Sequence, residues 1–234
     1  AINTIGKQFK NLKAFLNWCF DKEITDRFSL KHMVTYTEEV ENIYLKEKEV
    51  NDIFNIELED EWEAAVRDVF IIGCETALRY SDLISLTKEN FINDEIYVRP
   101  KKTEGKVNDN SIIIPISQKV QAILDRNNGT VPNGNMVMVT DFNRTIRKIC
   151  KKAKVNQIIQ ITKKVASKRT TQKIKKYELV RSHTGRRTFC TLKFLAGMEV
   201  EGIMGFSGHK TERSFKKYLK IDAMERAKKY KAFF

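Results

Sequence analysis

Four separated stretches of the sequence carry arginine, lysine, histidine and tyrosine side chains in short, distinct motifs. The motifs read ALRYSDLISL, KKTEGK, SHTGR and SGHKTERSFKKYLK in chain order. Each motif is a weak signal alone, because isolated charged side chains are mostly exposed to solvent. Taken together, they supply what phosphodiester transfer without a metal ion requires. The reactive side chains are those of Arg79, Lys102, His183, Arg186, His209 and Tyr218.

The proposed chemistry follows from the residue types. Arg79 and Arg186 carry planar, always-charged guanidinium groups, which match phosphate oxygens and stabilise the charge that develops on them. A tyrosine hydroxyl is a weak nucleophile at neutral pH unless a base or a positive field assists it. The deoxyribose 5′ oxygen leaves poorly without a proton donor, which a lysine on a hairpin could supply. The sequence shows neither a GxxxxGK phosphate loop nor a carboxylate cluster for two metal ions.

The charge balance indicates a polyanionic partner. The net charge is +13, and residues 144–176 contain many lysines and arginines but no aspartate or glutamate. Such a surface usually meets nucleic acid, although a basic surface without such a partner is the alternative. Contacts of this kind bind phosphate without reading sequence. The candidates are Lys101, Arg144, Arg147, Lys148, Lys151, Lys152, Lys210, Arg213 and the segment from Lys163 to Lys176.

Composition indicates a soluble globular chain that works in a reducing compartment, the cytoplasm of a bacterium in association with its nucleoid. No apolar run approaches the roughly 18–20 residues that span a bilayer, and the N-terminus has no signal-peptide layout. The four cysteines are far apart and are expected to be buried free thiols, whereas zinc is disfavoured because no histidine is spaced with them as a metal site requires. The sequence lacks an initiator methionine and begins inside an apparent helix, so we expect a piece of a longer protein.

Hydrophobic periodicity predicts the first elements. The stretch FKNLKAFLNWCF has a helical stripe, whereas residues 29–45 are interpreted as a second helix or an extended link. The charged stretch KEKEVNDIFNIEL is interpreted as a linker that opens the main domain. A helical period starts at Asp60. Ser81 is expected to cap a short helix over residues 82–86, which leaves Arg79 on the turn before it.

The second half of the chain mixes hairpins and helices. Two β-rich runs, over residues 95–99 and 111–116, predict a hairpin with Lys101 and Lys102 leaving its first strand. Ser117 is expected to cap the next helix, and TDFNRTIRKICKKA predicts another. Alternation in QIIQITKKVASKRTTQKIKKYELV predicts a second hairpin, and the chain ends in short helices. The fold class is therefore α+β and mainly α.

The order and spacing of the motifs resemble the tyrosine recombinase, or phage-type integrase, family over roughly residues 48–234. ALRYSDLISL is similar to the first arginine box of that family, SHTGRRTFCT to its HxxR box, and GFSGHKTERSFKKYLK to its final box with the nucleophile. RPKKTEGKVNDNSIIIPI is similar to its lysine hairpin, and the overall pattern is nearest to integrases of conjugative transposons. The resemblance implies a DNA breaking-rejoining catalytic domain over residues 47–234. Residues 1–46 would be the end of a helical core-binding domain and a linker.

The resemblance also implies roles in strand transfer. Tyr218 would attack the scissile phosphate and form a 3′-phosphotyrosyl bond while Arg79 and Arg186 clamp the non-bridging oxygens. Lys102 would be the general acid for the departing 5′ hydroxyl, with Lys101 as a rival that the sequence does not exclude. The bond energy kept in the phosphotyrosine would let a 5′ hydroxyl reseal the strand without ATP, metal or other cofactor.

The remaining residues of the motifs would support these groups. His183 would act as a base or orient the tyrosine, His209 would donate to the phosphate, and Asp82 would brace the turn of the first arginine. Arg187 is expected to contact the DNA backbone or to pack outward. It falls one residue off the HxxR spacing, and neighbours on a helix point about 100° apart.

The family also implies partners: double-stranded DNA, a homo-tetramer on paired sites, and no membrane. The tail DAMERAKKYKAFF has Ala223, Ala227, Tyr230 and Phe234 at helical spacing, and it would dock either on its own domain or on a neighbouring protomer. Two other functions remain open at this point. A type IB topoisomerase shares the cluster and the mechanism, and a catalytically silent DNA-binding module could retain the scaffold.

Overall fold

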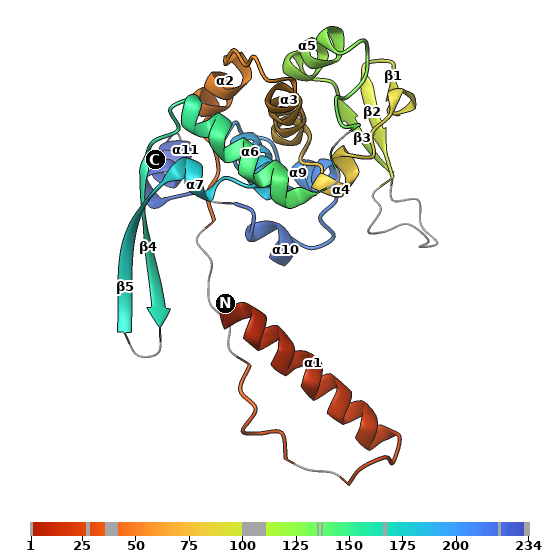
Figure 1. The fold of residues 1–234 in the computed structure, drawn as a ribbon, viewed down its shortest axis with the longest axis vertical. Coiled ribbons are helices and arrows are strands. Elements are labelled where there is room, and N and C mark those ends of the chain that lie inside the picture. The colour runs from red at the N-terminus through yellow and green to blue at the C-terminus, as the bar shows by residue number, and fades with distance from the viewer. Residues whose placement is uncertain are drawn as a thin grey trace. The chain divides into compact units, whose positions relative to one another are not determined.

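The computed structural model of the chain describes residues 2–26, 29–35, 42–99, 111–134, 136, 138–165, 168–219 and 221–231. These residues divide into two compact units (Figure 1). One unit comprises Ala1–Glu41 with Ile161–Gln172, and the other comprises Asn42–Gln160 with Lys173–Phe234. Among the described residues, no helix combines the length and the hydropathy that crossing a bilayer requires.

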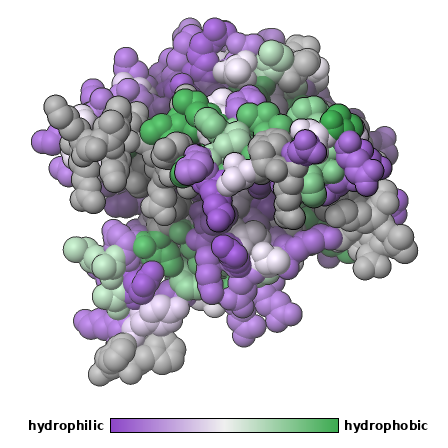
Figure 2. Space-filling view, turned by 90° about the horizontal axis from the view of Figure 1, so that it is seen from below, coloured by the Kyte–Doolittle hydropathy of each residue, from purple (hydrophilic) through white to green (hydrophobic). Residues whose placement is uncertain are grey.

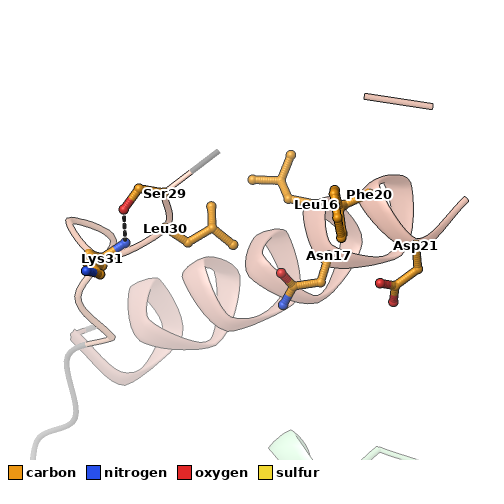
Figure 3. Close-up of a pocket in the computed structure, with 7 residues that line it drawn as sticks. All are labelled: Leu16, Asn17, Phe20, Asp21, Ser29, Leu30 and Lys31. Atoms are coloured by element: carbon orange, nitrogen blue, oxygen red, sulfur yellow. Dashed lines mark hydrogen bonds between the residues drawn. The ribbon is translucent and has the colours of Figure 1, made fainter. Parts of the chain in front are cut away.

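The first unit contains one long helix, α1 (Ile2–Asp21), as its periodicity predicts. Several large apolar side chains of α1 are exposed, and the rings of Phe15 and Trp18 stack with their centroids 6.1 Å apart. A pocket lies between the C-terminal half of α1 and residues 29–31 (Figure 3). It contains none of the predicted catalytic side chains. Residues 29–35 and 42–46 form no helix, and the residues between them lie outside the described part.

The second unit is built around α3 (Glu61–Thr76), which contacts five other helices among the described residues; α2, α5 and α6 surround it in Figure 1. Asp60 begins α3, because its side chain accepts a hydrogen bond from the amide of Glu63. Ser117 begins α5 in the same way, as predicted. The five neighbours are α2 (Glu47–Asn55), α4 (Tyr80–Leu83), α5 (Gln118–Arg126), α6 (Val139–Lys152) and α8 (Ser182–Leu195).

The charged stretch that was predicted to be a linker is instead the helix α2. Its apolar residues Val50 and Ile53 are buried in the main hydrophobic core, and Phe54 packs against that core. A buried ion pair joins α2 to the short helix α7 (Lys176–Leu179), because Lys176 Nζ lies 2.5 Å from Glu49 Oε2. Lys176 is therefore not part of an exposed basic surface, in contrast to the sequence-based expectation.

The predicted hairpins are both present. The first belongs to an antiparallel sheet ordered β1-β2-β3, with β1 (Phe91–Ile92), β2 (Glu95–Val98) and β3 (Ile112–Pro115). The second pairs β4 (Ile158–Val165) with β5 (Lys168–Lys175). All four cysteines are free and buried, as expected. The fold is mainly helical with small sheets, which confirms the predicted class.

The remaining elements are short. They are α4 (Tyr80–Leu83), the 3₁₀ helix η1 (Lys88–Asn90), α9 (Val200–Ser207), α10 (Glu212–Lys216) and α11 (Ala223–Tyr230). The tail helix α11 docks on its own chain here, since Tyr44 Oη donates a hydrogen bond to Glu225 and Lys229 Nζ donates one to the carbonyl oxygen of Phe194. Phe234 lies outside the described residues.

Candidate active site

Three of the predicted reactive side chains, those of His183, Arg186 and His209, lie around the ring of Tyr218. The ring centroid of His209 lies 4.5 Å from that of Tyr218, and the ring centroid of His183 lies 6.0 Å away. The guanidinium carbon of Arg186 lies 5.3 Å from the centre of the tyrosine ring. Residues that are far apart in the sequence are thus brought into one cluster.

Arg186 is the buried centre of this cluster, with only 2% of its surface exposed. It projects from α8, and its Nη1 donates a 2.6 Å hydrogen bond to the carbonyl oxygen of Ala77. Its Nη2 lies 3.2 Å from Nε2 of His209. Its Nε is buried and has no hydrogen-bond partner among the described residues. A buried guanidinium with an unused donor is suited to bind an anion.

Arg79 reaches the cluster through the turn between α3 and α4. Ala77 ends α3 in a left-handed conformation, with φ of 58°. The carbonyl oxygen of Arg79 accepts the amides of Asp82 and Leu83, so that Arg79 is itself the N-cap of α4. The prediction that Ser81 caps this helix is therefore wrong. The Ser81 hydroxyl lies 3.4 Å from Asp82 Oδ1.

A buried carboxylate supports the side chain of Arg79, and the charge of Arg79 changes the pKa of Arg186. Nη1 of Arg79 lies 3.8 Å from Oδ2 of Asp82, which is 2% exposed. Burial first, and then the Arg79 charge, lower the pKa of the Arg186 guanidinium. The hydrogen bond from Arg186 to the carbonyl of Ala77 joins the two arginine motifs directly.

His209 is placed by the glycine that precedes it. Gly208 ends α9 with a left-handed φ of 62°, and the amide of His209 then bonds to the carbonyl oxygen of Met204. The Nδ1 atom of His209 lies 2.7 Å from Oγ of Ser207, whose hydroxyl donates to the carbonyl oxygen of Ile203. This chain of donors requires a neutral ring with its proton on Nδ1, because Nε2 must accept from Arg186.

The electrostatics of the site favour neutral histidines. Burial, followed by the charges of Arg186 and Arg79, lowers the pKa of His209 to about 3. The pKa of His183 is also lowered, first by partial burial and then by the charges of Arg187, Arg186 and Arg79. Neutral histidines in a field of guanidinium groups can accept protons only when an anion enters, because an anion offsets the positive charge.

Tyr218 is held by a small second core formed by α8, α9 and α10. The side chain of Thr211 begins α10 by accepting from the amide of Ser214, and Phe215 on α10 is fully buried. The amide of Tyr218 bonds to the carbonyl oxygen of Phe215 at 2.7 Å. The Thr191 hydroxyl lies 3.4 Å from the carbonyl oxygen of Tyr218. These contacts set the turn that aims the tyrosine at α8.

The lysine candidates, Lys102 and Lys101, lie outside the described residues. The strands that flank them are described, and β3 contacts α9. A Cβ added to Gly208 by substitution would lie 2.8 Å from Cδ1 of Ile112, the first residue of β3. The strand that returns from the lysine segment therefore packs against the turn that carries His209.

Arg187 was expected to contact the DNA backbone or to pack outward, and the structure contradicts the outward packing. It is half-buried, and its guanidinium carbon lies 5.8 Å from the centre of the Tyr218 ring. Two consecutive arginines thus both face the tyrosine. A step of about 100° between neighbouring residues separates their Cα–Cβ directions, but arginine side chains are long enough to converge on one ring.

Three of the predicted DNA contacts on α6 already have protein partners. Arg144 pairs with Asp141 at 2.8 Å, and Lys152 pairs with Glu63 at 2.6 Å. The Nε of Arg147 donates a 3.2 Å hydrogen bond to the carbonyl oxygen of residue 180. These pairs weaken the case for Arg147, which is partly buried, more than for the other two, whose side chains remain exposed.

The other candidates are exposed. Lys148 and Lys151 lie on the solvent side of α6, and among the described residues neither forms an ion pair. Lys210 and Arg213 are both exposed. Lys210 directly follows His209, and Arg213 lies on α10, so both are close in sequence to residues of the Tyr218 cluster. Hydrophilic residues cover much of the face shown in Figure 2, around smaller groups of hydrophobic ones.

Sequence reasoning missed three supporting residues. Ser207 fixes the tautomer of His209, and Ala77 supplies the carbonyl that holds Arg186. Gly208 had a usable signal, because a glycine after an apolar helical stretch is typical of a helix end. Ala77 had none, since an alanine in a left-handed conformation leaves no trace in the sequence.

The sequence and the fold both match known proteins. The model of the Phage integrase family matches residues 44–225. The chain therefore belongs to the phage integrase family, whose members are tyrosine recombinases. A comparison with curated protein sequences found no significant match.

Solved structures share the fold at low sequence identity. The Tn1549 transposon integrase, solved with a circular intermediate DNA, is 18% identical, with a TM-score of 0.66 over 99% of this chain and 79% of that one. The XerA recombinase is 17% identical, with a TM-score of 0.59 over 96% and 74% of the two chains. The XerH recombinase bound to its difH substrate is 15% identical, with a TM-score of 0.57 over 94% and 63%.

Proposed function

We propose that Tyr218 is the nucleophile with which this site-specific DNA recombinase cuts and rejoins strands, integrating or excising a mobile element. The observation that carries the proposal is the convergence of Arg186, His183 and His209 on the Tyr218 ring. The unused donor of the buried Arg186 supports a phosphate as the anion that the cluster receives. The DNA in the structures of related integrases supports a double-stranded DNA substrate.

In the proposed reaction, Oη of Tyr218 attacks the scissile phosphorus. The bond to the 5′ oxygen breaks, and a 3′-phosphotyrosyl ester forms. The phenol proton passes to His183, which is neutral in the free site because of its lowered pKa. The departing 5′ oxygen takes a proton from Lys102, with Lys101 as the alternative donor. Rejoining reverses each transfer with a 5′ hydroxyl as the attacking group, so that one ester replaces another and no ATP is consumed.

The arginines supply charge stabilisation. Arg79 and Arg186 neutralise the two non-bridging oxygens as charge builds on them in the transition state. When the phosphate arrives, Nη2 of Arg186 turns from His209 to the phosphate, and His209 then donates to the same anion. This role requires a proton on Nε2 of His209, which the phosphate charge favours. The proposed reaction needs no metal ion.

Cleavage of nicked suicide duplexes tests the proposal. The duplexes are taken from the ends of the element that encodes the chain, and the reaction contains EDTA and no ATP. The full-length protein should form a covalent DNA adduct that survives SDS, and Tyr218→Phe should form none. Tyr230→Phe is a matched control, since this tyrosine lies on α11 and is expected to leave the adduct unchanged.

Three outcomes would contradict parts of the proposal. An adduct that persists in Tyr218→Phe would assign the nucleophile to another residue. DNA binding without any adduct would favour a silent DNA-binding module. Relaxation of supercoiled plasmids that lack the element ends would favour a topoisomerase. We also propose that the active form is a tetramer on paired sites, which light scattering of the protein–DNA complex can measure.

A further inference from the structure

We propose that Arg187 is a positioning residue, which holds the ring of Tyr218 in the orientation needed for attack. This inference rests on the proposed function of Tyr218 as the nucleophile. Its basis is that the guanidinium carbons of two consecutive arginines, Arg186 and Arg187, lie 5.3 Å and 5.8 Å from the centre of one tyrosine ring. A cation within about 6 Å of an aromatic face is attracted by the ring quadrupole.

The environment of Arg187 is that of an inward-facing group. The residue is half-buried, and its Nε is buried with no hydrogen-bond partner in the described part of the chain. Burial lowers its pKa, and Tyr218 acts in the opposite direction by favouring the charged form. A partly desolvated cation gains more from an aromatic ring than an exposed one does. The contact with Tyr218 therefore offsets part of the desolvation of this guanidinium.

Tyr218 needs such a contact because the hydrogen bonds of its backbone, to Phe215 and from Thr191, do not set the direction of its side chain. It follows α10, a helix of only five residues, and the bond from Thr191 to its carbonyl oxygen is long, at 3.4 Å. The tyrosine side chain itself must be oriented by its neighbours. A displacement of the Tyr218 hydroxyl from the phosphorus by even about 1 Å would slow the attack greatly.

The two arginines are not equivalent. Arg186 is tied to the carbonyl of Ala77 and to His209, and its remaining donor is assigned above to the scissile phosphate. Arg187 makes neither of these contacts, and the tyrosine is its aromatic partner. We therefore assign phosphate binding to Arg186 and tyrosine orientation to Arg187.

The test compares Arg187→Met, which keeps an apolar stem without charge, with Arg187→Lys, which keeps a cation. Lys193→Met is the matched control, because Lys193 lies on the same helix with its ammonium 5.8 Å from the ring centre of Phe189, outside the cluster. In the full-length protein at saturating DNA, single-turnover cleavage should fall roughly tenfold or more in Arg187→Met. It should be largely retained in Arg187→Lys and unchanged in Lys193→Met.

A second substrate separates the tyrosine from the phosphate. A methylphosphonate at the scissile position lacks one non-bridging charge, so it should relieve the defect of Arg186→Ala. It should not relieve Arg187→Met, because the defect there is in the position of the nucleophile. DNA affinity and its salt dependence should stay at the wild-type values in Arg187→Met.

Several results would overturn the inference. Wild-type cleavage by Arg187→Met would do so, as would relief of that variant by the methylphosphonate. A fall in the salt slope by about one would show a phosphate contact to the DNA backbone instead. Slow cleavage by both Arg187→Met and Arg187→Lys, together with a lowered melting temperature of both variants, would show a purely structural role. If the wild-type protein forms no adduct with any duplex, the proposed function itself fails.

Discussion

Replacement of Gly185 by alanine tests how closely α8 must approach α3. Gly185 directly precedes Arg186, and an added Cβ would lie 3.1 Å from the carbonyl carbon of Gly73 and 3.3 Å from the amide nitrogen of Cys74. Carbon contacts are favourable from about 3.5 Å, so the two backbones must separate by about 0.4 Å. Backbone cannot move aside as a flexible side chain can, and α3 and α8 would both have to shift.

The expected loss of stability is moderate. Overpacking of this kind destabilises by about 1–3 kcal/mol. Replacing a helical glycine by alanine raises the free energy of unfolding by about 0.5–1 kcal/mol, because the unfolded chain loses conformational freedom. The net loss should be about 0–2.5 kcal/mol, which corresponds to a melting temperature lower by up to roughly 10 °C for a chain of this size. Cleavage should fall as well, since the same shift moves the guanidinium of Arg186.

Gly205→Ala is the matched control. Gly205 also lies in a helix, α9, but nothing lies within 4 Å of the Cβ that alanine would add. This variant should be as stable as the wild type or gain up to about 1 kcal/mol. Thermal melting monitored by circular dichroism measures both variants. Equal stability of Gly185→Ala and Gly205→Ala would refute the argument that backbone contact limits this interface.

Three further predictions concern pH, salt and the tail helix. The ordinary pKa of histidine is about 6.5, so above this pH His209 is neutral in both the folded and the unfolded state. Between pH 6.5 and its folded pKa of about 3, only the unfolded chain takes up the proton. The folded state therefore loses stability as the pH falls through this range. Melting of the DNA-free wild type between about pH 7 and pH 5 should therefore fall more steeply than melting of His209→Asn, and parallel curves would contradict the lowered pKa. Lys148→Gln should reduce the slope of log affinity against log salt by about 0.9. Lys152→Gln should change this slope less, because Lys152 pairs with Glu63. A slope of Lys148→Gln equal to that of the wild type would show that Lys148 does not contact DNA. Tyr44→Phe should speed amide exchange in α11, because it removes the bond to Glu225, and unchanged exchange would show that other contacts dock this helix.

The sequence predicted those elements whose periodicity is strong. The helices α1, α3 and α6 and both hairpins follow from apolar patterns, and the Ser117 cap follows from its side-chain chemistry. The helix α2 was missed because its few apolar residues, Val50, Ile53 and Phe54, stand in a charged stretch, and their packing against the rest of the core stabilises the helix. The Ser81 cap failed because a backbone carbonyl, that of Arg79, took the role.

The sequence named residues that the structure brings together around Tyr218, but it did not predict their geometry. The motif spacing named the residues that converge on Tyr218, because their types match the needs of a phosphoryl transfer. The link from Arg186 to Ala77 depends on tertiary packing between α8 and the end of α3, which no local pattern encodes. The inward direction of Arg187 depends on the length and flexibility of its side chain, which the angular rule for helix neighbours does not describe.

The central claim is that Tyr218 carries the DNA during strand exchange. Its most direct test is to trap the covalent complex on a nicked duplex, digest both protein and DNA, and locate the nucleotide-bearing peptide by mass spectrometry. The account predicts a 3′-phosphonucleotide on the peptide that contains Tyr218. A nucleotide on any other residue, or a linkage through the 5′ end, would contradict it.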